Sequence, residues 1–167
     1  MFTRRFRPLA SARGAGATMV GVEIAFRAAA DGDRPFVEAV FFETQRWIIE
    51  ALFGWRGDAV ERARFAESYD AEHTAIVVVD GEDAGWVTVR RDIEIRIDAI
   101  YLTGANQRRG IGSAVLRRVI ADADAAGVAV RLSTAKINPA RRLYERLGFV
   151  DAYEDDTKVY LVRQPAR

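Results

Sequence analysis

The sequence contains no cysteine, and this absence excludes disulfide bonds, thiolate metal sites and a cysteine nucleophile. Histidine occurs once, at His73, so a serine–histidine–aspartate triad would depend on that residue. A lone histidine is weak evidence for a metal, because metal ligands normally come as a group. No apolar run approaches the roughly 18 residues that a membrane-spanning helix needs. We therefore expect no metal, no membrane partner and a cytoplasmic location.

Neither sign of charge is in marked excess, because 25 basic residues stand against 24 acidic ones. A dedicated nucleic-acid-binding protein normally carries a basic surplus, so we expect no nucleic-acid partner. Hydrophobic residues make up 50% of the 167 residues. This share is enough to build a core, excludes a wholly disordered chain, and at this length is typical of one domain.

The N-terminal end differs from the rest, because residues 1–22 contain four arginines and the first acidic residue is Glu23. We interpret residues 1–20 as a basic, disordered tail and residues 21–167 as a single folded domain. Three origins of the tail stay open. It is a translated stretch upstream of a true start at Met19, a disordered arm that contacts nucleic acid or membrane, or an arginine-rich transit peptide.

Hydrophobic periodicity separates strands from helices along the chain. Alternation and β-branched runs predict strands at residues 22–28, 74–79, 84–91, 93–102, 128–134, 149–153 and 159–162. Three- and four-residue spacing of apolar residues predicts helices at residues 35–54, 57–69, 111–127 and 138–148. The resulting order, βααβββαβαββ, predicts an α/β (mixed α+β) fold. We expect a central mixed sheet of about seven strands with helices on both faces.

A glycine-bearing loop at residues 107–112 reads Gln-Arg-Arg-Gly-Ile-Gly and opens a predicted helix. The free N–H groups and the dipole at a helix N-terminus attract anions. Gly110 and Gly112 let a phosphate approach the backbone, and Arg108 and Arg109 add positive charge. The loop is neither a Walker loop nor a Rossmann fingerprint, because the required lysine and glycine spacings are missing. Taken alone, it is equally compatible with a strand-to-helix turn that needs glycine for packing.

A second motif lies one helix and one strand further on, where residues 138–149 read Asn-Pro-Ala-Arg-Arg-Leu-Tyr-Glu-Arg-Leu-Gly-Phe. Together with the glycine loop and with Ile-Asp-Ala-Ile-Tyr-Leu at residues 97–102, it resembles the GNAT superfamily of N-acetyltransferases, in the bacterial single-domain form. The similarity covers about residues 22–163 in element order and is specific mainly over residues 95–150. Two motifs in the right order are much more specific than either one alone.

The resemblance implies acetyl-CoA as co-substrate and two adjacent parallel strands that splay apart to admit its pantetheine arm. It implies that the acyl carbonyl accepts a backbone N–H near Leu102, as in an oxyanion hole. The cofactor-binding residues that it implies are Ile100, Tyr101, Leu102, Gln107, Arg108, Arg109, Gly110, Ile111, Gly112, Ser113, Asn138 and Arg141. Asn138 departs from the family, because it stands two residues before Ala140 where three is the commoner spacing.

The resemblance also matches Tyr144 to a tyrosine that protonates the leaving thiolate. A phenol stays protonated at neutral pH and can act as an acid, although a core aromatic with a satisfied hydroxyl is the other interpretation. Arg96 occupies the position at which some family members carry a glutamate that acts as general base. Asp98 and Glu94 lie on the same face of the strand as Arg96. They are the candidates for accepting the proton of the amine through water. Both are equally compatible with ordinary strand carboxylates.

The acceptor site that the family implies lies between the first helices and the last hairpin. Its candidate residues are Phe41, Trp47, Trp55 and Tyr153, beside the acidic residues 154–156. Aromatic rings and carboxylates suit a cationic amine, while helix core and a solvated turn are the other interpretations. We predict acetyl transfer to the primary amine of a small molecule by direct attack in a ternary complex. A protein or peptide acetyltransferase and a non-catalytic CoA-binding sensor are the alternatives, and a homodimer is common in the family.

Overall fold

The structure is a computed structural model, and it describes Leu9, residues 17–19 and residues 21–166. The rest of the predicted tail lies outside the described residues. Residues 17–19 form a short strand, β1, that pairs with the first predicted strand.

The elements follow the predicted order, with β1 added at the start. The strands are β1 (Ala17–Met19), β2 (Val22–Ala28), β3 (Thr74–Val79), β4 (Glu82–Arg91), β5 (Ile95–Leu102), β6 (Val130–Ala135), β7 (Val150–Glu154) and β8 (Lys158–Arg163). The helices are α1 (Arg34–Phe53), α2 (Asp58–Ser68), α3 (Ile111–Ala126) and α4 (Arg141–Arg146). Short 3-10 turns precede α1 and follow β5.

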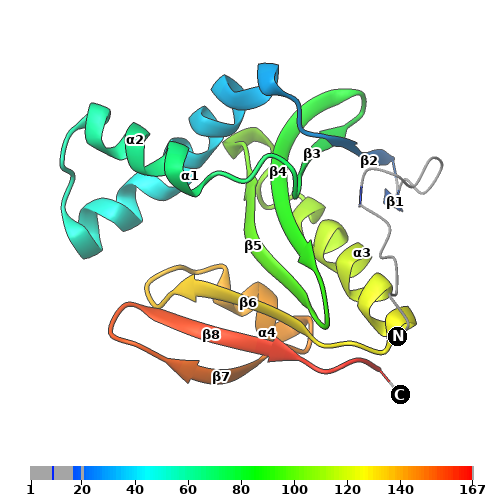
Figure 1. Cartoon of the computed structure of the whole chain (residues 1–167). Helices are drawn as coiled ribbons and strands as arrows, with labels where there is room; N and C mark the ends of the chain where they lie inside the picture. The colour runs from blue at the N-terminus through cyan, green and yellow to red at the C-terminus, as the bar shows by residue number, and fades with distance from the viewer. Residues whose placement is uncertain (1–8, 10–16, 20, 167) are drawn as a thin grey trace.

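The strands form one sheet in the order β1-β2-β3-β4-β5-β6-β8-β7 (Figure 1). Every neighbouring pair is antiparallel except β5 and β6, which are parallel and are connected through α3. A parallel pair needs such a crossover, because its strands cannot be joined by a tight hairpin. The mixed α/β fold class predicted from the sequence is confirmed.

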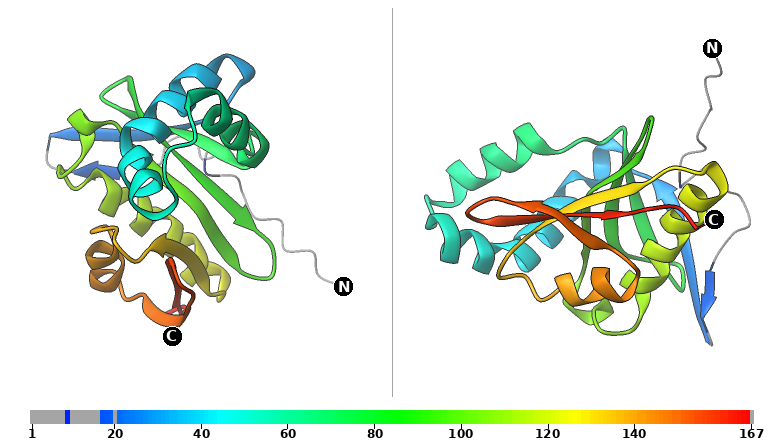
Figure 2. Two further views of the ribbon diagram at one scale, coloured as in Figure 1. Left: turned by 90° about the vertical axis from the view of Figure 1, so that its left-hand side faces the viewer. Right: turned by 90° about the horizontal axis from the view of Figure 1, so that it is seen from below.

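Helices cover both faces of the sheet, with α1 and α2 on one side and α3 and α4 on the other (Figure 2). Successive side chains of β4 point alternately to the two faces of the sheet and so contribute to both cores. Trp86 packs with Val37, Val40 and Phe65 of the first two helices, whereas Val87 belongs to the cluster built on α3. The sheet therefore lies between two hydrophobic cores.

A β-bulge interrupts β5 near its middle. Thr88 of β4 lies opposite Ala99, and Val89 lies opposite Ile97, so Asp98 is an extra residue on the β5 side. An extra residue moves all following side chains to the other face of the strand. Ile97 therefore packs on the α3 side, whereas Ala99 packs on the α1 side.

The two parallel strands stay together for a short distance. Ile95–Ile97 pair with Val130–Leu132, and beyond these residues each strand keeps only its outer neighbour. β5 pairs with β4 as far as Leu102, and β6 pairs with β8 as far as Ala135. The sheet is therefore open between the carboxyl ends of β5 and β6, as the predicted splay requires.

The short helix α4 begins later than the sequence predicted. Asn138 and Pro139 form a turn, in which the Asn138 side-chain oxygen accepts the N–H of Ala140 at 3.0 Å. The N–H of Arg141 bonds back to the Asn138 carbonyl at 3.3 Å. Asn138 thus fixes the turn that leads from β6 into α4.

Candidate active site

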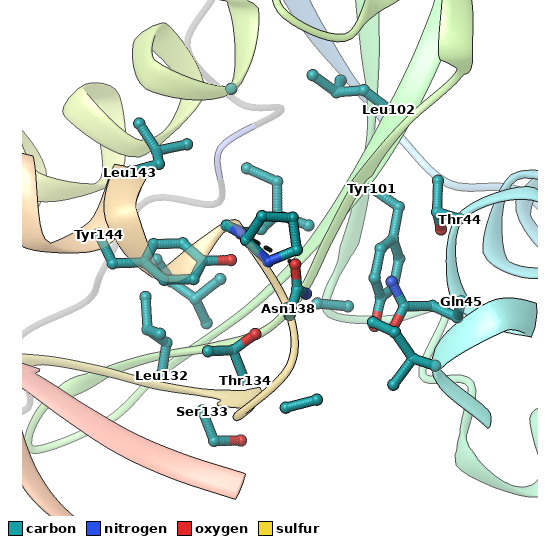
Figure 3. A pocket seen from close by; sticks show the side chains of 18 of the residues that line it. Thr44, Gln45, Tyr101, Leu102, Leu132, Ser133, Thr134, Asn138, Leu143 and Tyr144 are labelled. Carbon is teal, nitrogen blue, oxygen red and sulfur yellow. Dashed lines mark hydrogen bonds between the residues drawn. The ribbon is translucent and has the colours of Figure 1, made fainter. Parts of the chain in front are cut away.

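A cavity of about 880 Å³ occupies the opening between β5 and β6. Side chains of α1, which lies on one face of the sheet, form one wall of the cavity. The opposite wall comes from the glycine loop, the start of α3 and residues 138–144, on the other face (Figure 3). The cavity therefore passes through the sheet, and a ligand entering from one face can meet a ligand entering from the other.

The backbone of β5 forms part of this cavity. Residues 99–102 pair with β4 along one edge, and their other edge lines the cavity instead of pairing with β6. Backbone N–H and C=O groups are strong hydrogen-bonding groups that need partners. The exposed edge of β5 therefore offers a row of hydrogen bonds to an extended ligand.

The glycine loop places the N-terminus of α3 at one end of the cavity. Gly110 has φ 78°, the left-handed conformation that glycine adopts most easily, and α3 begins at the next residue. The first N–H groups of a helix have no partner within the helix, and Gly112 and Ser113 line the cavity at this point. Gln107 donates its side-chain N–H to the Leu102 carbonyl at 2.9 Å, which fixes the loop against the end of β5.

Gly112 leaves space in the cavity. A Cβ atom built at this position would lie 3.6 Å from Leu143 and 3.8 Å from Leu102, both in ordinary contact. The fold itself therefore does not require glycine here. The missing side chain leaves room for a ligand group against the first turn of α3.

Tyr144 projects from α4 toward the centre of the cavity (Figure 3). The residue is only 7% exposed, and its ring packs edge-on against Phe149 with centroids 6.2 Å apart. Burial raises its pKa to about 12, because the phenolate loses solvation. Among the described residues the hydroxyl has no hydrogen-bond partner, so a protonated donor faces the cavity.

Tyr101 lies on the opposite wall, beside Gln45 of α1 (Figure 3). The bulge at Asp98 turns its side chain to this face. Burial raises its pKa above the ordinary value, and the nearby Tyr144 raises it further. The two tyrosines and the Gln45 amide make the centre of the cavity polar but uncharged.

The predicted proton acceptors are both held by arginines. One Asp98 oxygen accepts Arg96 Nε at 2.6 Å and the other accepts Arg90 Nε at 2.7 Å. Asp98 lines the cavity. Glu94 pairs with Arg131 at 2.6 Å and lies outside the cavity lining. Both carboxylates therefore have an ion-pairing function in this structure.

Of the four predicted acceptor residues, one lines the cavity and three do not. Phe41 lines it. Trp47 is 46% exposed and Tyr153 is 60% exposed, and neither lines the cavity. Trp55 donates its indole N–H to Asp58 at 3.0 Å, with Arg46 over its ring.

Most of the predicted cofactor-binding residues do line the cavity: Ile100, Tyr101, Leu102, Gln107, Arg108, Gly110, Gly112, Ser113 and Asn138. The other three lie elsewhere. Arg109 bonds Asn106 at 3.1 Å, Ile111 is buried in the core, and Arg141 pairs with Glu145 and Asp151.

Sequence reasoning placed Phe41 of α1 at the acceptor site but missed most of the wall that this helix contributes. The missed residues are Gln45, Ile48, Ile49 and Leu52, at the spacing of one helix face. That spacing was visible, but it predicts core packing as readily as a cavity wall. Ser133 and Lys158, on β6 and β8, were also missed.

The buried tyrosines make the fold sensitive to alkali. Between the ordinary tyrosine pKa near 10 and the folded value of about 12 for Tyr144, the unfolded chain releases a proton that the folded chain retains. Stability is therefore lost as the pH rises through this window, by up to about 2–3 kcal/mol for this residue. We expect the urea midpoint to fall between pH 9 and pH 11.5, and the fall to be smaller in Tyr144→Phe. An equal fall in both proteins would contradict the burial argument.

Across the described ranges, no helix is long and apolar enough to cross a bilayer. The same residues contain no group of three histidine, aspartate or glutamate side chains placed to hold a metal ion.

Residues 70–151 match the family model of the acetyltransferase (GNAT) domain. This stretch contains the opened strand pair, the glycine loop and Tyr144, so it supplies every wall of the cavity except α1 and β8. The fold is that of GNAT acetyltransferases. This stretch of the chain belongs to the GNAT superfamily.

Solved structures share this fold at low sequence identity. The PaiA N-acetyltransferase from Thermoplasma acidophilum, in complex with coenzyme A, has a TM-score of 0.69 at 15% identity, over 84% of this chain and 98% of that one. The ribosomal-protein-S18-alanine N-acetyltransferase from Escherichia coli has a TM-score of 0.63 at 19% identity, over 86% and 95%. N-acetylglutamate synthase from Neisseria gonorrhoeae, in complex with coenzyme A and N-acetyl-glutamate, has a TM-score of 0.62 at 18% identity, over 86% and 35%. No curated protein sequence matches the chain.

Proposed function

We propose that this protein transfers an acetyl group from acetyl-CoA to the primary amine of a small molecule. The observation that carries the proposal is the cavity through the sheet, which joins the open edge of β5, the N-terminus of α3 and the Tyr144 hydroxyl. Coenzyme A is bound by the Thermoplasma and Neisseria proteins of the same fold.

The residues present fit acetyl-CoA. The first turn of α3, with Gly110 and Gly112, suits a pyrophosphate, because free N–H groups and open backbone meet there. Arg108 lines the cavity at this end and adds positive charge. The unpaired edge of residues 98–102 suits the amide groups of a pantetheine arm, which can pair with it as a strand does.

The chemistry needs one group that gives a proton and one route that removes a proton. The neutral amine attacks the thioester carbonyl carbon, a carbon–nitrogen bond forms, and the carbon–sulfur bond then breaks. Tyr144 donates its phenolic proton to the leaving sulfur, because its raised pKa keeps it protonated at neutral pH. Solvent then returns a proton to the tyrosine oxygen.

The second proton leaves the amine nitrogen after attack. Both Asp98 oxygens already accept hydrogen bonds from arginines, and Glu94 lies outside the cavity lining. Water in the open cavity is therefore the proposed carrier for this proton. Asp98, which lines the cavity, is the carboxylate beside the path that this proton takes.

The first test is thiol release from acetyl-CoA with a panel of amines, together with a calorimetric titration of coenzyme A. Release with one class of amine supports the proposal and names the acceptor. Failure of coenzyme A to bind at millimolar concentration would overturn it. Tight binding without release from any amine would instead favour the CoA-binding sensor.

Gly112→Val tests where the pyrophosphate binds. The Cβ position makes only ordinary contacts, so we expect the free energy of unfolding to change by less than about 1 kcal/mol. The side chain would fill the space against the first turn of α3, so the Kd for coenzyme A should rise at least about tenfold. Ala121→Val on the exposed side of the same helix is the matched control. Equal affinity in the two variants would contradict this placement.

A further inference from the structure

The wall of the cavity formed by the C-terminal part of α1 is apolar. Ile49, Leu52 and Phe53 line it, and Phe53 is 51% exposed. The N-terminal half of the same helix is buried against the sheet through Val37 and Val40. The C-terminal half therefore directs its apolar side chains at open space, where a ligand can cover them.

The charges around this space do not suit a molecule with several ammonium groups. Among the described residues that line the cavity, Asp98 is the one carboxylate, and both its oxygens are occupied by Arg90 and Arg96. Lys158 lines the wall opposite α1 and has no ion pair with any described residue. A second ammonium group would meet an apolar wall and an uncompensated lysine, without a free counter-charge.

Three of the aromatic and acidic residues that the sequence suggested for a cationic acceptor, namely Trp55, Glu154 and Asp155, are already engaged with other side chains or backbone. Arg46 lies 4.3 Å from the centroid of the Trp55 ring. Asp155 accepts the N–H groups of Thr157 and Lys158, each at 2.8 Å, and these bonds lower its pKa to about 2. Glu154 pairs with Lys136 at 3.0 Å. The contacts of these side chains stabilise the conformation of the last hairpin and of the end of α1.

From these observations we infer that the acceptor is a monoamine with an apolar body, such as an alkylamine or an arylalkylamine. Its single nitrogen lies among the uncharged polar groups of Tyr101, Gln45 and Ser133, and its body covers the apolar wall of α1. The inference rests on the proposed acetyl transfer and narrows its substrate class.

A matched pair of amines tests the charge requirement. Hexylamine and 1,6-diaminohexane have the same length and differ by one terminal ammonium group. With saturating acetyl-CoA, at one pH and one ionic strength, we expect kcat/KM for hexylamine to be at least about tenfold higher. A preference for the diamine would overturn the inference and leave acetyl transfer itself intact.

A matched pair of variants tests the wall. Leu52→Glu places a carboxylate on the cavity side of α1, and Ala51→Glu places one on its exposed side, away from the cavity lining. Leu52→Glu should lower kcat/KM for hexylamine at least about tenfold and raise it for the diamine. Ala51→Glu should leave both values unchanged. The same response in both variants would overturn the assignment of the wall.

Failure of the inference is distinguishable from failure of the proposed function. If no amine releases thiol, the monoamine assignment falls, and the calorimetric titration decides separately whether coenzyme A binds. If peptides or polyamines release thiol faster than hexylamine, acetyl transfer stands and the apolar monoamine is wrong.

Discussion

Tyr144→Phe should lower kcat for acetyl transfer by about 10²-fold, which is the lower end of what general acid catalysis contributes. The variant removes a protonated hydroxyl that faces the cavity without a partner among the described residues. It keeps the ring that packs against Phe149. Because the lost interaction forms only as the thiolate leaves, the Kd for coenzyme A should change less than about twofold. Steady-state thiol release and calorimetry measure the two quantities.

Tyr153→Phe is the control for this experiment. Tyr153 is 60% exposed and stacks on Tyr160 away from the cavity lining, so its loss should leave kcat unchanged. If Tyr144→Phe weakens coenzyme A binding and lowers kcat in proportion, the residue acts in packing. An unchanged kcat would remove it from the chemistry.

Gly85→Ala should destabilise the fold by at least about 3 kcal/mol, at the upper end of overpacking effects. A Cβ atom at Gly85 would lie 2.2 Å from the Tyr101 carbonyl oxygen and 2.8 Å from the Leu102 Cα. Both atoms belong to the backbone of β5, so no side-chain rotation can relieve the contact. Urea unfolding followed by circular dichroism measures the loss.

Gly32→Ala is the matched control, because a Cβ there meets nothing within 4 Å and we expect a change within about 0.5 kcal/mol. Equal stability of the two variants would show that β4 and β5 do not approach as closely as described. The folded fraction of Gly85→Ala should also bind coenzyme A poorly, since β5 must shift at the residues that line the cavity.

Local signals in the sequence were sufficient for the order of the elements. The hairpin turn after β3 and the apolar spacing of α3 are set by nearby residues, and both are present in the structure. The turn is tighter than the predicted residues 80–83, because β4 already begins at Glu82. The bulge at Asp98 could not be predicted, because alternation from Ile93 to Ala99 reads as one regular strand. A slip in pairing depends on the partner strand, and it decides which face Tyr101 occupies.

In the candidate site, too, features set by local sequence could be predicted, and features that depend on distant partners could not. The glycine loop could be located from sequence, because the chemistry of a helix N-terminus is local. Most of the acceptor wall could not be located, because the spacing of Ile48, Ile49 and Leu52 does not show whether a sheet or a cavity faces them. Trp47 and Tyr153 were chosen for their aromatic character, and the structure places both on exposed surface.

The short contact between β5 and β6 also bears on the order of folding. Three residue pairs join these strands, and they are separated in sequence by the loop and helix of residues 103–129. The β3–β4–β5 meander and the β7–β8 hairpin close over much shorter chain segments, which costs less loop entropy. We expect these two units to form first, β6 to pair with β8 of the hairpin, and the two halves to dock afterwards through the three pairs between β5 and β6. The cavity therefore comes into existence only in the last step, when two independently formed halves meet.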